Sequence, residues 1–180
     1  MFLLRPSFAL LVILSIAAPS ALSLPSDREQ AIHITADQAM RDEKKGLTTY
    51  SGNVVFTQGS LKINADTITI FQTEDGHDKV IAKGQPARLE QRQELGEELM
   101  KAKADTIEYF RDEDRIHLQP NAKIEQGGSI VSGKTIDYYI TDQLVKVGSD
   151  QSEENSRVQV VIPPSAIEKN EDKSGNPKRK

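Results

Sequence analysis

The sequence repeats one short unit several times, and this repetition limits the possible folds more than any other feature. Residues 52–71, "GNVVFTQGSLKINADTITIF", align without a gap with residues 120–139, "PNAKIEQGGSIVSGKTIDYY". A third copy, interrupted by a charged insertion, contributes "GQPARLEQ" (84–91) and "AKADTIEYF" (102–110). The segment "IHITADQAMRD" (32–42) carries the same Thr-Ala-Asp step. A chain of this kind stacks copies of a single supersecondary motif.

Each unit has the pattern of two strands joined by a turn. Segments such as "NVVFTQ", "ARLEQ" and "AKIEQ" place apolar side chains at alternate positions, and breaks such as "TEDGHD" and "RDEDR" separate them. A period of two gives every strand one apolar face and one polar face. The sequence therefore predicts an all-β domain of repeated antiparallel strands.

The alternation changes phase within the unit, from odd positions at Ile63 to even positions at Ile68. One extra residue in the strand would return both halves to a common face, so the slip predicts a β-bulge. The same slip recurs in two other copies. The predicted bulges lie at Ala65-Asp66, Ala104-Asp105 and Gly133-Lys134.

One stretch, "RQELGEELMKAK" (92–103), has helical composition. It has Gly96 in its middle and no capping residue at its start. We therefore expect a long hairpin excursion here rather than a stable helix.

The chain begins with the layout of a secretory signal peptide. Arg5 precedes an apolar run, and small residues lead to a cleavage site after Ser23. The run stops at Pro19, short of the ~20 apolar residues that a membrane-spanning helix needs. We expect a cleaved signal peptide at 1–23, a β-domain at 24–167 and a disordered polar tail at 168–180.

Composition removes several classes of function. The formal net charge of −4 gives no general attraction to nucleic acid, and the absence of cysteine leaves an exported fold without disulfides. His33, His77 and His117 lack the spacing of a metal site, and the sequence contains no G-x-S-x-G, H-E-x-x-H or S-x-x-K motif. We expect no catalytic residue, no metal and no cofactor, and hence a protein that is not an enzyme.

Residues 128–135, "GSIVSGKT", satisfy the phosphate-binding loop pattern G-x-x-x-x-G-K-[ST]. That loop needs a helix after it, whose N-terminus meets the phosphates. The following residues, "TIDYYITDQLVKV", alternate like a strand instead. The repeat already accounts for the position of Lys134, so we predict no nucleotide site.

What remains is a set of amphipathic strands with mostly aliphatic inner faces. Such strands can form a sandwich filled by its own side chains, or a more open roll whose inner face holds an apolar ligand. Without any family resemblance, the sequence favours the filled core, because small β domains usually pack a core with their own side chains. The predicted inward residues are Ile32, Ile34, Val54, Phe56, Ile63, Ile68, Ile70, Leu89, Ile107, Tyr109, Ile124, Ile136, Tyr138 and Ile140.

A family resemblance changes this balance. "IHITADQ", "YSGNVVFTQGSLKINADTITI", "GQPARL" and "RVQVVIPPS" together resemble the OstA-like family of periplasmic bridge proteins, the A component of the lipopolysaccharide transport machine. The resemblance runs from Ile32 to Ile167 and includes the pattern G-N-V-x-x-x-Q-G-x-x-x-x-x-A-D at residues 52–66. The charged insertion at 92–101 and the tail "EKNEDKSGNPKRK" depart from it.

The resemblance implies a slightly twisted, open β-jellyroll in the periplasm, with a hydrophobic groove that binds the lipid A acyl chains of lipopolysaccharide. It also implies end-to-end assembly between an inner-membrane C component and an outer-membrane D component. The groove residues would be the inward set above, from Ile32 to Tyr138. The alternative left open is a secreted β-domain with a self-filled core that binds only protein partners.

The two terminal segments predict how copies would join head to tail. "AIHITA" opens the domain, and "RVQVVIP" closes it before Pro163-Pro164 end the strand. If the roll consists of consecutive hairpins, these strands lie at opposite ends with unpaired edges, which can pair between protomers. The predicted edge residues are Ile32, Ile34, Val158, Val160 and Ile162.

Overall fold

The computed structural model describes residues 27–72, 79–92, 98–149 and 157–164. They form one short 3-10 helix, η1 (Asp27–Glu29), and otherwise strands joined by turns. The strands are β1 (Ile32–Thr35), β2 (Gln38–Asp42), β3 (Leu47–Gln58), β4 (Leu61–Phe71), β5 (Lys79–Gln91), β6 (Met100–Phe110), β7 (Arg115–Gln119), β8 (Ala122–Gln126), β9 (Ser129–Gly133), β10 (Thr135–Tyr139), β11 (Leu144–Gly148) and β12 (Gln159–Val161).

All of these strands pair antiparallel, in the order β1-β3-β4-β5-β6-β7-β10-β11, with β2, β8, β9 and β12 attached as branches. The branches arise because the long strands bend. Residues 47–51 of β3 pair with β2, and residues 55–58 pair with β1. Likewise, residues 101–103 of β6 pair with β8, and residues 106–110 pair with β7.

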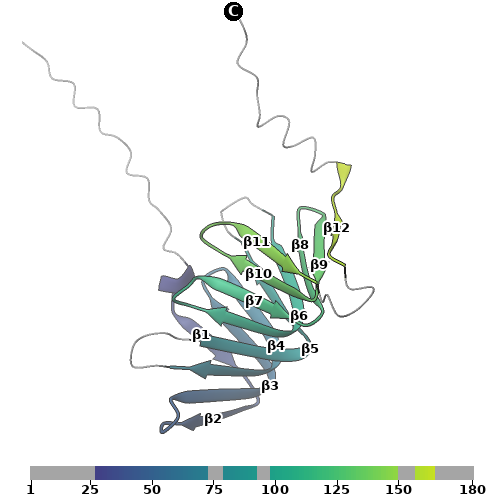
Figure 1. The fold of residues 1–180 in the computed structure, drawn as a ribbon. Helices are drawn as coiled ribbons and strands as arrows, with labels where there is room; N and C mark the ends of the chain where they lie inside the picture. Colours follow the sequence, from purple (N-terminus) through teal and green to yellow (C-terminus); the bar gives the residue numbers. More distant parts are fainter. Residues whose placement is uncertain (1–26, 73–78, 93–97, 150–156, 165–180) are drawn as a thin grey trace, which may run out of the picture.

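The bends divide the sheet into two halves that face each other (Figure 1). Half-sheet I contains β1, β8, β9, β12 and the segments of β3 to β6 on their side. Half-sheet II contains β2, β7, β10, β11 and the remaining segments of β3 to β6. In the described residues the sheet does not close on itself, so the fold is the open, all-β jellyroll of repeated antiparallel strands that the sequence predicts.

The phase slips of the sequence coincide with the bends. The β3–β4 register shifts between Ser51 and Val54, and inward burial passes from Ile63 to Ile68 along β4. Burial also changes phase in β6, between Ala104 and Ile107. The prediction of a third bulge is wrong, because two separate strands are found there instead of one bulged strand. At Gly133-Lys134 the chain breaks into β9 and β10, because the Lys134 N–H bonds to the Gly148 carbonyl instead of continuing a ladder.

Two aligned asparagines occupy equivalent corners at these bends. The Asn53 side chain donates to Asp37 Oδ2 at 3.0 Å, and Asn121 donates to Asp105 Oδ2 at 2.8 Å. Both asparagines have positive φ angles, 47° and 60°, which Asn tolerates better than most residues. The sequence repeat is therefore also a structural repeat.

Parts of the predicted domain plan lie outside the described residues. These are the signal peptide at 1–23 and the tail at 168–180. In the stretch with helical composition, Met100–Lys103 belong to β6, whereas residues 93–97 are outside the description. None of the described residues belongs to a helix that is long and apolar enough to span a membrane.

Candidate functional site

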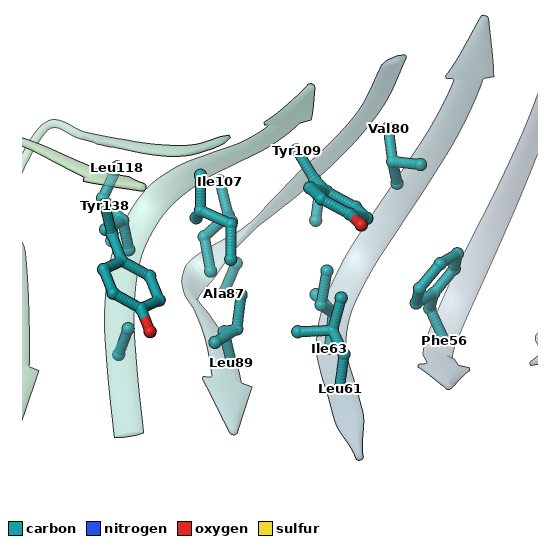
Figure 2. Close-up of a cluster of buried hydrophobic side chains, with 14 of the residues drawn as sticks. Phe56, Leu61, Ile63, Val80, Ala87, Leu89, Ile107, Tyr109, Leu118 and Tyr138 are labelled. Carbon is teal, nitrogen blue, oxygen red and sulfur yellow. The ribbon is translucent and has the colours of Figure 1, made fainter. Parts of the chain in front are cut away.

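The predicted inward residues meet in one apolar interior between the two half-sheets. Figure 2 shows side chains from both halves gathered there, among them Phe56 and Leu89 from half-sheet I and Val80 and Tyr109 from half-sheet II. Ile32, Ile34 and Ile70 are half-buried and pack against this cluster, as does Ile140. The predicted residues that are at most 6% exposed are Val54, Phe56, Ile63, Ile68, Leu89, Ile107, Tyr109, Ile124, Ile136 and Tyr138.

Sequence reasoning missed about half of the interior. Alternation in "KVIAK" and "RIHLQ" was a sufficient signal for Val80, Ala82, Ile116 and Leu118. The other missed residues either have small side chains or lie at strand ends, where too few alternating positions are present to show a period of two. They are Leu61, Ala87, Met100, Ala102, Ala104 and Ala122.

In this conformation the interior is filled by its own side chains. Aliphatic residues from facing halves contact one another, and their exposed fractions are close to zero. A ligand that enters between the half-sheets must therefore part them and replace one set of apolar contacts with another.

The strand ends of half-sheet I form rim I, which consists of the described residues at 58–61, 91–92, 98–100 and 126–129. A polar network organises this rim around Asp27 of η1. Asp27 Oδ1 accepts from the Ser60 N–H at 2.7 Å, and Oδ2 accepts from Ser60 Oγ at 2.7 Å and from Gln91 Nε2 at 2.9 Å. A side chain at Gly59 would collide with the Asp27 carboxylate, so the close approach of η1 depends on glycine.

The strand ends of half-sheet II form rim II, which consists of the described residues at 42–47, 71–72 and 79, 110–115 and 139–144. Cations and aromatic rings alternate on its outer face. Lys79 Nζ lies 5.2 Å from the centre of the Phe110 ring, and the Arg115 guanidinium lies 4.0 Å from the same centre. Lys79 also pairs with Glu108 at 3.0 Å.

Arg115 of rim II contacts two carboxylates. Its Nε lies 2.6 Å from Glu113 Oε2, and its Nη1 lies 2.9 Å from Asp137 Oδ1. The hydrogen bond to Glu113, helped by the bond to Asp137, raises the pKa of Arg115 against the opposing effect of burial. His117 Nδ1 contacts the same Asp137 oxygen at 2.8 Å.

The predicted edge strands lie at opposite ends of the stack (Figure 1). Ile32 and Ile34 of β1 are half-buried, with outward neighbours His33 and Thr35 exposed. The alternation expected near the C-terminus does not produce an inner face, because β12 pairs only with β9 among the described strands and exposes both sides. The apolar residues of β12 and the two beside it, Val158, Val160, Val161 and Ile162, are 40%, 54%, 57% and 56% exposed.

Two other sequence features are resolved by the geometry. The "GSIVSGKT" segment is followed by strand β10, so it lacks the helix N-terminus that a phosphate-binding loop requires. Within the described residues, no three His, Cys, Asp or Glu side chains gather as metal ligands would.

The fold and the interior place this protein in the class of open β-jellyroll domains with an apolar core between two half-sheets. A family model described as the LptA/(LptD N-terminal domain) LPS transport protein matches residues 33–144. The chain belongs to this family of lipopolysaccharide transport proteins, which confirms the family resemblance of its sequence segments.

Its relatives span nearly the same length. The chain is 37% identical over 155 residues to the lipopolysaccharide export system protein LptH of Pseudomonas aeruginosa, covering 83% of this chain and 89% of that protein. It is 32% identical over 166 residues to LptA of Escherichia coli K12, covering 91% and 88%. The crystal structure of LptH, described as a periplasmic component of the lipopolysaccharide transport device, superposes with a TM-score of 0.72 at 38% identity, covering 78% of this chain and all of that one.

Proposed function

We propose that this protein binds lipopolysaccharide in the periplasm by taking the lipid A acyl chains between its two half-sheets. In this role it bridges an inner-membrane C component and an outer-membrane D component of the transport machine. The observation that carries the proposal is the continuous aliphatic interior of an unclosed stack, in a chain that belongs to a lipopolysaccharide transport family.

Transfer energetics favour an interior of this kind. An acyl chain of about 12 carbons that is exposed to water costs roughly 9 kcal/mol, at ~0.8 kcal/mol per CH₂. A lipid with several chains therefore cannot cross an aqueous space unshielded. Successive positions along a repeated apolar interior are similar in energy, so this chain needs no energy source of its own and direction is set elsewhere in the machine.

Strand β1 offers a test that spares the fully buried core. Ile34 faces the interior but is only half-buried, and His33 beside it faces solvent. The Ile34→Glu protein should bind purified lipopolysaccharide at least about tenfold more weakly, because an unpaired carboxylate would oppose an acyl chain. The His33→Glu protein adds a comparable charge on the outer face and should bind like the parent. A folded Ile34→Glu protein that binds as tightly as the parent would contradict the proposal.

One observation favours a second candidate, an interaction module with a self-filled core. The interior side chains are nearly unexposed in this conformation. This candidate predicts no saturable binding of lipopolysaccharide, with binding to protein partners intact. Titration of the parent protein with lipopolysaccharide separates the two functions.

We also propose head-to-tail self-association, in which β12 of one protomer pairs with β1 of the next. It is supported by the exposed apolar side chains of β12 and by the fact that, among the described strands, β1 pairs with β3 alone. Because the two edges differ, the contact does not close and copies should form rods. Deletion of residues 157–180 should abolish concentration-dependent growth in light scattering, and deletion of 168–180 alone should not. Rods that persist in the longer deletion would exclude β12 from the joint.

A further inference from the structure

On three strands of half-sheet I, the last inward-facing residue is a glutamine. The segments "VVFTQ", "ARLEQ" and "AKIEQ" each place two apolar side chains and then glutamine at alternate positions. In the structure Gln58 and Gln91 are 1% and 3% exposed, and Gln126 is half-buried. Among the described residues, Gln58 and Gln91 are the buried polar side chains, and both lie on the face that carries the apolar core.

The strand registers place these glutamines at one level of half-sheet I. Gln58 pairs with Leu61, and Gln91 pairs with Met100. The neighbouring pairs Lys62–Glu90 and Lys101–Glu125 extend the same level across the intervening strands. The level, which we call the rim I row, runs through Ile32, Gln58, Leu61, Gln91, Met100, Gln126 and Ser129.

Glutamine therefore recurs on every second strand along the stack. Neighbouring strands lie about 4.8 Å apart, so successive glutamines are spaced by roughly 10 Å in the direction in which strands stack. Apolar Leu61 and Met100 fill the positions between them. The row is thus a line of amides along the edge of the interior, in the direction that the proposed transport follows.

Hydrogen bonds fix which end of each buried amide is available. Gln91 faces a carboxylate of Asp27, and Gln58 faces the backbone carbonyl of Gln30 at 3.1 Å. Both partners only accept hydrogen bonds, so the amide NH₂ groups must point toward them. In Gln91 this leaves the carbonyl oxygen Oε1 buried without a hydrogen-bond partner. A buried acceptor in this state is unfavourable unless a donor arrives.

We propose that the rim I row is a polar subsite that accepts hydrogen bonds from hydroxyl or amide N–H groups next to the head end of the ligand's acyl chains. This inference rests on the proposed function and adds an orientation to it. The polar head of the glycolipid lies at rim I, and its chains run inward between Phe56, Leu89 and the facing half-sheet. Gln91 Oε1 is the acceptor with the clearest need for such a donor.

Rim II offers no matching row. The last inward level of half-sheet II runs through Arg41, Thr48, Ile70, Val80, Tyr109, Ile116, Tyr138 and Val145. Apart from Arg41 and Thr48 at its β2–β3 end, these side chains are aliphatic or aromatic and none is an amide, and the rim II cations Lys79 and Arg115 pair with carboxylates. The asymmetry favours entry of chains from rim I.

The Gln91→Leu protein tests this subsite, because leucine keeps an apolar side chain of similar size and removes the acceptor. The probes are purified lipid A, whose chains carry hydroxyl and amide donors, and didodecyl phosphate, whose two chains carry none. Loss of one neutral hydrogen bond should weaken lipid A binding about 3- to 10-fold and leave didodecyl phosphate binding unchanged. The Gln38→Leu protein, altered at an exposed position of β2, should bind both probes like the parent.

Selectivity is the decisive readout, because a merely structural effect would weaken both probes equally. Equal weakening, or no weakening of lipid A binding, would overturn the subsite. If the parent binds neither probe, the proposed function fails together with this inference. If the parent binds lipid A and Ile34→Glu weakens it while Gln91→Leu does not, the interior site stands and only the glutamine row is wrong.

Discussion

The two rims have the same backbone construction but opposite chemistry. At both rims consecutive antiparallel strands end, and each rim carries a last inward level of side chains. At rim I that level carries an amide on every second strand, and at rim II it carries aliphatic and tyrosine side chains with Thr48 and Arg41 at one end. The repeat that produces both rims therefore leaves room for each strand end to be specialised.

The cations Lys79 and Arg115 of rim II pair with carboxylates of half-sheet II itself, whereas rim I depends on η1, a segment from outside the sheet. On rim II, Lys79 and Arg115 lie over the rings of Phe110 and its neighbours, and their charges are paired. On rim I, Asp27 of η1 accepts three hydrogen bonds from two strand ends. Under the proposed polar subsite, rim I is the rim that receives the polar group of the ligand.

The largest effect should come from truncating the core that both half-sheets share. Phe56 of half-sheet I and Ile116 of half-sheet II are 0% and 1% exposed. Phe56→Ala should lower the free energy of unfolding by about 3–5 kcal/mol, and Ile116→Ala by about 2–5 kcal/mol. Urea unfolding followed by circular dichroism should show one transition in each case. Two separate transitions would mean that the halves are independent.

The bend that sets the rims apart should be the next most sensitive feature. Asn121 has a φ of 60° and donates to Asp105. Asn121→Ala loses this hydrogen bond and places alanine in a left-handed conformation, which together should cost about 2 kcal/mol. Asn121→Gly loses only the bond and should cost about 1 kcal/mol. Equal unfolding midpoints for the two variants would show that backbone conformation is not what Asn121 provides.

The ion pairs of rim II should contribute less. Arg115→Met should destabilise the protein by about 1 kcal/mol, because it removes two partly shielded ion pairs and a ring contact. Arg88→Met, at an exposed position of β5, should change stability by less than ~0.5 kcal/mol. Salt should reduce the difference between the variants. A difference that is unchanged in high salt would assign the effect to packing.

The raised pKa of Arg115 also fixes the direction of its pH dependence. A cation whose pKa is raised on folding contributes stability below its ordinary pKa and loses it as pH rises through the folded value. Both values lie above the physiological range, so the titration of Arg115 itself should not change stability near neutral pH.

Much of the interior could be predicted from the sequence, because alternation and repetition both follow from strand geometry. Ile63, Ile68 and Tyr109 were predicted to lie inside, and they do. Alanines such as Ala82 and Ala104 were missed because their small side chains give a weak pattern. The third bulge was predicted wrongly because the break at Lys134 depends on Gly148, a partner in another strand.

The glutamines show a different limit of sequence reasoning. Gln58, Gln91 and Gln126 were visible as aligned letters in the repeat. Their shared level on half-sheet I depends on the pairing of several strands, and the orientation of the Gln91 amide depends on Asp27, 64 residues away in the chain. Neither fact follows from local periodicity.

The central claim is that lipid chains occupy the space between the half-sheets, and site-specific photocrosslinking on β1 tests it most directly. A photoreactive phenylalanine analogue at Ile34 would face the interior, and the same residue at Thr35 would face solvent. With bound lipopolysaccharide, position 34 should form a lipid adduct on irradiation and position 35 should not. Equal adducts at both positions, or none at 34 under conditions where binding is measured, would contradict the account.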